Sequence, residues 1–391
     1  MTEAKTHPFL CTINSGRGED GVSRVSRLLW QVLSGATRGE CRHLNLLPEG
    51  KRLAAASDKL RFARRMLTEH LRGRVDWIMY DHLGPARIQA LIPRALARPY
   101  AVFLHSIEVW SPLSEGRKQV LRDASVRIAN SNYTAERVAA AHPEIGRIEV
   151  CHLALPPLDG ANFMLPKTRL RDNGAARNGP HTRNGEPDAA LLNRINAQAI
   201  LIVGRMSSAE RYKGHDQLIE IWPEVRKSVP AGQLIIVGGG DDVARLKRKA
   251  VESGAGESII FAGHTSDETL QQLYRRAAIF CMPSTSEGFG LVYLEAMRHR
   301  LPCIASPDNA AAEVVADGET GLLVKQAATI ELAHAITGLL QNPARRKEMG
   351  EAGFERWQRL FSFENFEQRM LTILEQASLL KPETISERCV A

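Results

Sequence analysis

The feature that most constrains the fold is a regular alternation of short apolar runs with helical patterns, which occurs twice in the 391-residue chain. The first series predicts the strands Phe9–Ile13, Trp77–Tyr80, Ala101–Leu104, Val126–Ala129 and Ile148–His152. The second predicts the strands Ala199–Val203, Gln233–Val237, Ile259–Ala262, Ala278–Met282 and Pro302–Ala305. Because strands that alternate with helices form parallel βαβ units, we expect an α/β protein with two parallel sheets. Ligands of such folds bind at the carboxyl ends of the strands, so we expect a cleft between the two sheets.

A polar segment separates the two series. Residues 171–188, RDNGAARNGPHTRNGEPD, show no apolar period, which is typical of a linker or mobile loop. We therefore expect a first domain over residues 1–165, a linker over 166–195 and a second domain over 196–362. The final region is predicted to be helical with a break near Ser362, and the helix from about residue 363 is expected to pack back on the first domain.

The composition excludes several classes of protein. Hydrophobic residues make up 44% of the chain and charged residues 24%, as in folded globular domains. The sequence contains no run of about 18 apolar residues that could span a membrane, and MTEAKTHPFL lacks the pattern of a secretory signal. The six cysteines form no CxxC pair, so we expect reduced thiols in a cytoplasmic protein.

The segment MPSTSEGFGLVYLEAM, residues 282–297, carries the strongest chemical signal. A predicted strand ends near Met282, glycines allow a tight turn, and a helix is predicted to begin near Leu291. If most of the interval between Glu287 and Glu295 is helical, the two carboxylates lie about 12 Å apart along the axis. A carboxylate can accept hydrogen bonds from two adjacent hydroxyls of a ribose or a sugar. The alternative is a capped helix with two solvent-exposed glutamates.

Two other segments place polar residues after predicted strands. In LIVGRMSSAERYKG, Arg205 and Lys213 flank a loop between a strand and a helix, where they could neutralise a leaving diphosphate or remain exposed cations. In VFLHSIEVW, His105 follows an apolar strand and either faces a ligand or is held structurally at the strand end. The first loop contains Gly16, Gly18 and Gly21 in GxGxxG spacing, but no clear ribose-binding acid follows, so a flexible loop without a ligand stays possible.

Together these segments resemble family 4 of the glycosyltransferases, also described as the glycogen-synthase-like or group 1 glycosyltransferases. The resemblance is strongest over Ala199–Val324, where five elements follow the family's order: VGRMSSAERYKGHDQLI, LIIVGGGDDVARL, IIFAGHTSDETLQQLYRRA, MPSTSEGFGLVYLEAM and EVVADGETGLLV. In the first half, LHSIEVW and IANSNYTAERV match more loosely. The resemblance implies the GT-B fold, in which two Rossmann-like domains, one for the acceptor and one for the donor, face an inter-domain cleft.

The resemblance also implies a role for each matching residue. Arg205 and Lys213 would hold the donor diphosphate, Glu295 would bind the ribose hydroxyls, and His105 would meet the sugar from the first domain. Glu287 would hold the sugar ring, together with the main chain of Phe289, Gly290 and Leu291. The nucleobase would lie near the loop that contains His264, and the loop around Gly18 and Gly21 would close over donor and acceptor.

Three positions depart from the family pattern. Ser106 and Arg300 stand where glycine is common, and Ala154 replaces an Asn-Gly turn. None of these positions is a charged residue of the site. Ser106 and Ala154 lie in or next to the first domain, so they bear on acceptor geometry more than on donor binding.

The activity implied is transfer of a hexose, of the mannose or glucose type, from a GDP- or UDP-sugar to a glycan or lipid-linked acceptor. The resemblance further implies retention of the anomeric configuration and no metal, with the leaving diphosphate deprotonating the incoming hydroxyl. Alternatives on the same fold are a sugar-nucleotide epimerase, a phosphorylase and a non-catalytic sugar-nucleotide-binding protein. The donor base, the sugar and the acceptor stay open.

Positive charge is concentrated in the first part of the chain, where residues 1–150 hold 23 Lys and Arg against 15 Asp and Glu. Residues 51–74 alone hold eight basic and two acidic side chains. Ser57 can cap a helix here, with a predicted apolar stripe of Leu60, Ala63, Met66, Leu67 and Leu71. This segment is either a core-packed helix with a solvated basic face or a surface that docks on anionic lipid at the cytoplasmic face of a membrane. With one aromatic residue in the stretch, nucleic acid is the poorer alternative.

Overall fold

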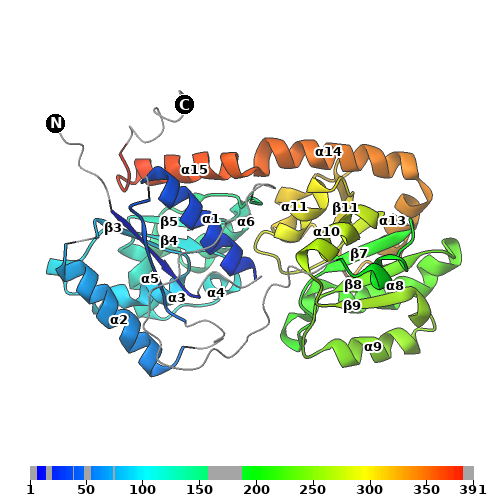
Figure 1. The fold of residues 1–391 in the computed structure, drawn as a ribbon, viewed down its shortest axis with the longest axis horizontal. Coiled ribbons are helices and arrows are strands. Elements are labelled where there is room, and N and C mark those ends of the chain that lie inside the picture. Colours follow the sequence, from blue (N-terminus) through cyan, green and yellow to red (C-terminus); the bar gives the residue numbers. More distant parts are fainter. Residues whose placement is uncertain are drawn as a thin grey trace. The chain divides into compact units, whose positions relative to one another are not determined.

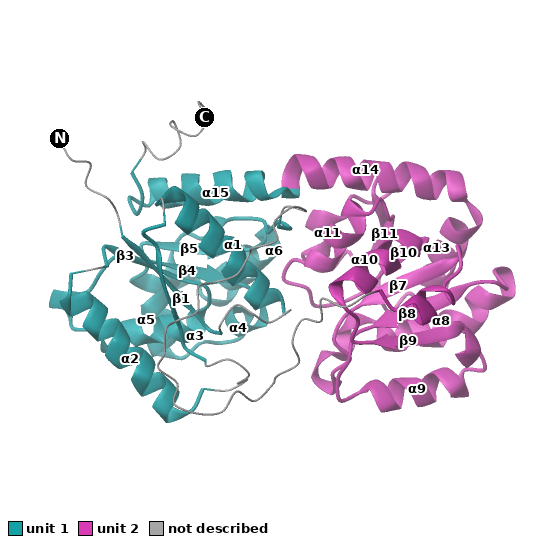
Figure 2. Ribbon diagram, in the orientation of Figure 1, with its two compact units in different colours: residues 1–177, 361–391 teal, residues 178–360 magenta. Residues whose placement is uncertain are grey.

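A computed structural model describes residues 7–14, 20–37, 39–47, 54–73, 75–156 and 187–381. The chain divides into two compact units (Figures 1 and 2). The first comprises residues 1–177 and 361–391, and the second comprises residues 178–360. Most of the segment predicted as a linker, 166–195, lies outside the described residues, and a short helix, α7 (Ala189–Leu192), occupies part of the remainder.

The first unit contains a six-stranded parallel sheet with the order β2-β1-β3-β4-β5-β6. Its strands are β1 (Pro8–Thr12), β2 (Arg42–Asn45), β3 (Trp77–Tyr80), β4 (Tyr100–Leu104), β5 (Val126–Ala129) and β6 (Glu149–Val150). All residues of β1, β3 and β4 are buried, because helices cover both faces of a parallel sheet. The strand order reverses between β1 and β3, so the loops after these strands diverge at one edge.

Helices of the first unit are α1 (Gly21–Ala36), α2 (Ala56–Leu71), α3 (Leu83–Ala86), α4 (Ile107–Trp110), α5 (Glu115–Arg122), α6 (Asn132–Ala141) and α15 (Phe363–Gln376). Short 3₁₀ turns are η1 (Arg87–Leu91), η2 (Arg94–Leu96) and η3 (Pro143–Ile145). Helix α15 begins after Ser362, whose hydroxyl accepts a hydrogen bond from the amide of Asn365. It contacts α1, and the Arg369 guanidinium donates to the carbonyl of His152 at 3.0 Å, so α15 belongs to this unit although it follows the second unit in sequence.

The second unit contains another six-stranded parallel sheet, with the order β12-β11-β10-β7-β8-β9. Its strands are β7 (Ala199–Val203), β8 (Gln233–Val237), β9 (Ile259–Gly263), β10 (Ile279–Cys281), β11 (Cys303–Ala305) and β12 (Gly321–Leu323). This is the strand order of a dinucleotide-binding Rossmann fold. The order reverses between β7 and β10, and open α/β sheets bind ligands outside the carboxyl ends of the strands at such a reversal.

Helices of the second unit follow its strands in the expected alternation. Besides α7, they are α8 (His215–Ser228), α9 (Val243–Glu252), α10 (Asp267–Arg276), α11 (Leu291–Arg298), α12 (Ala311–Val314), α13 (Thr329–Gln341) and α14 (Pro343–Phe361), with 3₁₀ turns η4 (Ser208–Lys213) and η5 (Gly256–Ser258). Helix α8 packs against α9 and α13 and buries Leu218, Trp222 and Val225. The loop that follows β7 therefore runs into a well-anchored helix.

Helix α2 corrects two predictions. Its N-cap residue is Ala55 rather than Ser57, and the Asp58 carboxylate accepts the Ala55 amide at 3.0 Å. The predicted apolar stripe is only partly correct: Met66 is buried as predicted, but Leu60, Leu67 and Leu71 are exposed, and Phe62 and His70 are buried instead. Both sets recur with helical spacing, so the periodicity cannot decide between them. The larger ring of Phe62 is placed in the core instead of Leu60.

Candidate active site

The loop after β7 lies directly against the loop after β8. A Cβ atom on Gly238 would lie 2.1 Å from the Gly204 carbonyl oxygen, and one on Gly240 would lie 1.9 Å from the Met206 carbonyl oxygen. Both glycines have positive φ, 128° and 155°, which other residues rarely adopt. The Met206 amide also donates to the Gly239 carbonyl at 2.9 Å. Glycine at positions 238 and 240 therefore lets the two loops approach closely, and this contact holds the backbone on either side of Arg205 in place.

Arg205 and Lys213, predicted to bind a diphosphate, converge on one carboxylate. An Arg205 Nη2 donates to Oε1 of Glu210, and Lys213 Nζ lies 3.3 Å from Oε2 of the same residue. The Lys213 side chain is 19% exposed, so it is not a free surface cation, whereas the Arg205 side chain is 60% exposed. Glu210 interrupts the 3₁₀ turn η4, with φ −123° and ψ 30°. The structure thus brings both predicted cations to the carboxyl edge of β7.

Glu287 lies in the loop after β10, on the other side of the reversal in strand order. Burial raises the pKa of Glu287, while Lys213 and a hydrogen bond from Ser284 oppose the rise. Its Oε1 atom is shielded from solvent and has no hydrogen-bond partner among the described residues. A buried carboxylate oxygen without a donor is costly, and a sugar hydroxyl would satisfy it.

Helix α11 begins at Leu291, as the sequence predicted, after Gly290 in the left-handed conformation with φ 90°. Residues 287–290 therefore lie outside the helix, and only part of the interval between the two glutamates is helical. The separation of about 12 Å along a helix axis therefore does not apply. A side chain on Gly290 would overlap the Tyr293 ring at 2.5 Å, so glycine is required here. Phe289 and Leu291 are buried on either side of this turn.

Glu295 is 3% exposed, which rules out the alternative of two solvated glutamates. The Tyr274 hydroxyl, from α10, donates to Glu295 Oε2 at 2.7 Å. The Tyr274 ring stacks on His299 with the ring centroids 5.3 Å apart. Tyr274 therefore holds the carboxylate that the sequence predicted to bind ribose.

His264 lies in the loop between β9 and α10. Its ring packs so closely on Gly239 that a Cβ atom there would lie 2.4 Å from Nε2. The predicted base-binding loop is thus in contact with the glycine loop after β8. In this unit, the loops after β7, β8, β9 and β10 place the predicted donor-binding residues at the carboxyl edge of one sheet.

His105 belongs to the first unit and is buried at the end of β4. Its Nε2 atom donates to the Asp81 carbonyl oxygen at 2.6 Å, and its amide donates to Glu108 at 2.7 Å. The ring of His82 stacks on it with the centroids 5.7 Å apart. One ring nitrogen is therefore already used within the protein, as the structural alternative for His105 predicted. Its orientation is fixed before any ligand arrives.

The loop after β1 is only partly described. Gly21 is the first residue of α1, and Asp20 caps this helix by accepting the amide of Ser23 at 2.9 Å. Gly18, predicted to help close the site, lies outside the described residues. The Asp81 carboxylate connects the residue after β1 to helix α1. It accepts hydrogen bonds from the Ile13 amide at 2.9 Å and from the Ser26 hydroxyl at 2.5 Å.

Three residues that contact the candidate site residues were not singled out by the sequence analysis, namely Glu210, Tyr274 and Asp81. Glu210 and Tyr274 lie inside segments that carried the family resemblance, so their positions were visible but their partners were not. Asp81 follows a fully apolar strand directly, as His105 does, and this shared position was the available signal.

The described residues include no group of three or more His, Cys, Asp or Glu side chains placed to hold a metal ion. Within the same ranges, no helix combines the length and apolar character needed to cross a membrane.

Comparison with known proteins identifies the family. Residues 192–356 match the model of glycosyl transferases group 1. A GDP-mannose-dependent alpha-(1-6)-phosphatidylinositol monomannoside mannosyltransferase of Mycolicibacterium smegmatis is 31% identical over 311 residues, which cover 75% of each chain. A D-inositol 3-phosphate glycosyltransferase of Nocardia farcinica is 29% identical and covers 72% of this chain and 59% of its own. The chain therefore belongs to the group 1 glycosyltransferases.

Solved structures of low sequence identity show the same fold. Sucrose-phosphate synthase from Thermosynechococcus elongatus superposes with a TM-score of 0.73 at 22% identity, covering 94% of this chain and 98% of its own. Anabaena HepE, in complex with UDP-glucose, gives a TM-score of 0.71 at 20% identity and covers 95% of this chain and 100% of its own. The predicted α/β class and GT-B fold are confirmed, as is the prediction of a glycosyltransferase.

Proposed function

We propose that this glycosyltransferase transfers a hexose, preferably mannose from GDP-mannose, to a glycolipid acceptor with retention of the anomeric configuration. The observation that carries the proposal is the convergence of Arg205 and Lys213 beside the partly buried Glu287, where the strand order of the second sheet reverses. Cations bind a diphosphate there, and a carboxylate with an unsatisfied oxygen binds the hydroxyls of the attached sugar.

Each group has one part in the reaction. Arg205 and Lys213 stabilise the negative charge that develops on the diphosphate as the bond between the sugar C1 and the phosphate oxygen breaks. Glu295, held by Tyr274, accepts hydrogen bonds from the ribose, and Glu287 from the sugar. The loop with His264 faces the base, and the family resemblance assigns a contact with the sugar to His105.

Retention follows when the new bond forms on the face from which the diphosphate leaves. The departing phosphate oxygen takes the proton of the acceptor hydroxyl while that hydroxyl oxygen bonds to C1. No strong protein base is then needed, and Glu287 acts as a positioning and charge-stabilising group rather than as a nucleophile. Because arginine and lysine neutralise the diphosphate, the reaction needs no metal ion.

The choice of donor and acceptor is supported by the relatives. The Mycolicibacterium smegmatis protein is named for GDP-mannose and a phosphatidylinositol mannoside, and the Nocardia farcinica protein for an inositol phosphate. Both names describe transfer, which favours a transferase over the epimerase and the non-catalytic binding protein. A mannosyl donor and an inositol-containing lipid are therefore the first substrates to test.

Product analysis by proton NMR tests the proposal. The protein is incubated with GDP-mannose and a phosphatidylinositol mannoside in the presence of excess chelator. We expect an α-linked mannosyl product, because GDP-mannose carries the α configuration, and no loss of rate compared with the reaction without chelator. An inverted product or complete loss of activity with chelator would contradict the mechanism.

The same assay tests the site. Arg205→Ala and Lys213→Ala are each expected to cost about 2–4 kcal/mol of transition-state stabilisation, as for loss of one preorganised donor. Glu224→Gln, on the exposed side of α8, serves as a control and is expected to leave kcat/KM unchanged. Near-native rates for both cation variants would refute the assignment.

A lipid-linked acceptor would explain the basic surface around helix α2 of the first unit. Helix α2 exposes Leu60, Leu67 and Leu71 to solvent. Five basic residues accompany them on the described part of the segment: Lys59, Arg61, Arg64, Arg65 and Arg72. We propose that this face binds anionic lipid on the cytoplasmic side of a membrane, since leucines enter the interface while basic side chains pair with the headgroups.

A further inference from the structure

The predicted diphosphate site contains as many acidic as basic side chains. Arg205 and Lys213 supply two positive charges, while Glu210 pairs with both of them and Glu287 interacts electrostatically with Lys213. A site that binds a dianion or trianion should carry a positive excess. One of the two carboxylates must therefore move away from the cations when the diphosphate binds.

Glu210 is the carboxylate whose position competes with a diphosphate. Its two oxygens are divided between the cations, with Oε1 on Arg205 and Oε2 on Lys213, in the way that a bridging phosphate group would contact them. Glu287 comes from the loop after β10, and its Oε1 atom has no hydrogen-bond partner in the described structure. Glu210 Oε2 also makes no hydrogen bond there, but it lies in ion-pair range of Lys213, 3.3 Å away. Glu287 therefore has a free position for the sugar, whereas Glu210 takes up the cations themselves.

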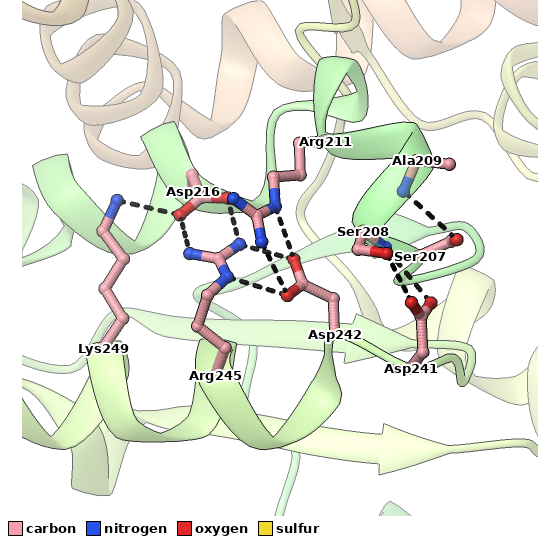
Figure 3. A network of polar contacts seen from close by, with 9 residues as sticks. All are labelled: Ser207, Ser208, Ala209, Arg211, Asp216, Asp241, Asp242, Arg245 and Lys249. Carbon is pink, nitrogen blue, oxygen red and sulfur yellow. Dashed lines mark hydrogen bonds and ion pairs between the residues drawn. The ribbon is translucent and has the colours of Figure 1, made fainter.

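The backbone on both sides of Glu210 is held in place by a network of charges that Figure 3 shows. Before Glu210, the Ser208 amide donates to Asp241 at 3.1 Å, and the Ser208 hydroxyl donates to the same carboxylate. After Glu210, the Arg211 guanidinium donates to Asp242 at 3.2 Å. A ligand that displaces the Glu210 carboxylate will therefore rotate the side chain rather than move the loop.

Helices α8 and α9 support this anchor. Arg245, on α9, donates to Asp242 at 2.5 Å and to Asp216 of α8 at 2.6 Å, and Lys249 adds a contact with Asp216 at 3.1 Å. These bonds lower the pKa of Asp216 to about 2, chiefly through the hydrogen bond from Arg245. The acidic residues of the network stay ionised near neutral pH, so the loop keeps its position with or without a ligand (Figure 3).

We propose that Glu210 is an internal counter-ion, which occupies the diphosphate position in the free protein and rotates away when the nucleotide binds. The inference rests on the proposed function, because it takes Arg205 and Lys213 as the diphosphate ligands. Glu210 stabilises the empty site by neutralising two neighbouring cations. It also sets the affinity for the nucleotide, because every anion that binds must first displace it.

Binding of GDP to wild-type protein and to Glu210→Gln, measured by titration calorimetry, tests the inference. The amide keeps the size of the side chain but removes the competing charge, so we expect the dissociation constant to fall by about tenfold, the factor that corresponds to about 1.4 kcal/mol. Log Kd should also depend more steeply on log salt concentration in the variant, since its site carries one more net positive charge. Glu220→Gln is the matched control, because Glu220 pairs with Lys249 on the exposed side of α8.

Two further measurements distinguish a counter-ion role of Glu210 from a purely structural role. Glu210→Asp keeps the charge on a shorter side chain that cannot reach both cations, so GDP should bind more tightly than to wild type but less tightly than to Glu210→Gln. Without ligand, Glu210→Gln should melt at a lower temperature than wild type, and saturating GDP should reduce this difference. A structural role would lower the melting temperature equally with and without GDP.

The outcomes are distinct. If wild type binds GDP and Glu210→Gln binds it equally or more weakly, the counter-ion role is wrong while the proposed function stands. If wild type binds neither GDP nor UDP, the proposed function fails and the inference fails with it. Tighter binding to Glu210→Gln with an unchanged Glu220→Gln control supports both.

Discussion

At the scale of single residues, Arg300 shows how one side chain can compensate for an unfavourable backbone. Its φ of 57° lies in the left-handed region, and this is a position where the family commonly has glycine. The guanidinium lies over the Phe354 ring, 3.8 Å from its centroid, and pairs with Glu351 at 2.8 Å. A Cβ atom on Gly350 would lie 2.1 Å from the Arg300 carbonyl oxygen, so α14 approaches this turn closely. The side chain thus helps to hold α14.

We predict that Arg300→Ala is less stable than Arg300→Gly by about 1 kcal/mol, because alanine retains the left-handed strain and glycine does not. Both variants lose the contacts with Phe354 and Glu351. The free energy of unfolding in urea, compared between the two variants, measures the difference. If Arg300→Ala is as stable as Arg300→Gly, the left-handed conformation carries no cost at this position.

Tyr274 leads to a second prediction at this scale. A hydrogen bond to a charged group contributes about 1.5–3 kcal/mol, so Tyr274→Phe should raise the donor KM by about tenfold or more. The turnover number should change little, since the ribose is remote from the reacting bond. Tyr293→Phe is the control, because its hydroxyl donates to the Met282 carbonyl at 2.5 Å rather than to a carboxylate of the site. A rise in KM that is equal in both variants would contradict the role of Tyr274.

Pairings of this kind mark the limit of what the sequence could predict at the residue scale. The sequence singled out Arg205, Lys213, Glu287 and Glu295 as candidates because charged residues in loops after strands carry a chemical signal and because the surrounding segments resemble the family. Glu210 pairs with Arg205 and Lys213 because of the kink in η4. This kink depends on a tertiary contact, the hydrogen bond from Arg211 to Asp242 at the start of α9. A sequence pattern does not contain such contacts.

At the scale of elements, the long apolar strands were predicted within a residue or two, and the break before α15 at the correct residue. The prediction missed β2 and β12. The sequence of β2, RHLN, is mostly polar because it is an edge strand, and β12 has only three residues, GLL. Edge and very short strands lack the buried apolar run on which the prediction relied.

Helix α2 shows that an apolar period does not state which side faces the core. Since Leu60, Leu67 and Leu71 are 71%, 43% and 66% exposed, we predict that the protein co-sediments with anionic vesicles at low salt. Replacing the three leucines with glutamine should weaken binding at all salt concentrations. Replacing Arg61, Arg64 and Arg65 with glutamate should remove mainly its salt-sensitive part, at about 1 kcal/mol per basic residue.

Leu91→Gln provides the control for this prediction, because Leu91 is also an exposed leucine of the first unit but lies outside α2. It should bind vesicles as wild type does. If wild type stays in the supernatant with vesicles rich in anionic lipid, the surface does not bind membranes, and a soluble acceptor becomes the better proposal.

At the scale of the whole molecule, buried ionisable groups set how stability depends on pH. Burial lowers the pKa of His82 and of His215 to about 4, and it also lowers the pKa of His70 and His299. A histidine with a lowered pKa binds its proton more readily in the unfolded chain. It therefore reduces stability as the pH falls from about 6.5 towards 4.

Asp81 works in the opposite direction. Burial raises its pKa from 3.8 to about 7, so the folded state holds a proton that the unfolded chain releases. Its contribution to stability is complete below pH 3.8 and is lost as the pH rises towards 7. Glu287, whose pKa burial also raises, acts in the same direction as Asp81. The four histidines outnumber these two carboxyl groups, so we predict that the free energy of unfolding rises between pH 4.5 and 6.5. Each proton of difference between the two states adds about 1.4 kcal/mol per pH unit to this slope.

The variant Asp81→Asn isolates the opposing group, since the amide can still accept the Ile13 amide but does not titrate. Urea unfolding of wild type and Asp81→Asn, followed from pH 4.5 to 6.5, should give a steeper rise for the variant because the opposing contribution of Asp81 is then absent. Asp308→Asn, at an exposed position in the loop after β11, should leave the slope unchanged. A slope for Asp81→Asn that matches wild type would mean that Asp81 is ionised in the folded protein across this range, with Ser26 and Ile13 stabilising the charge against burial.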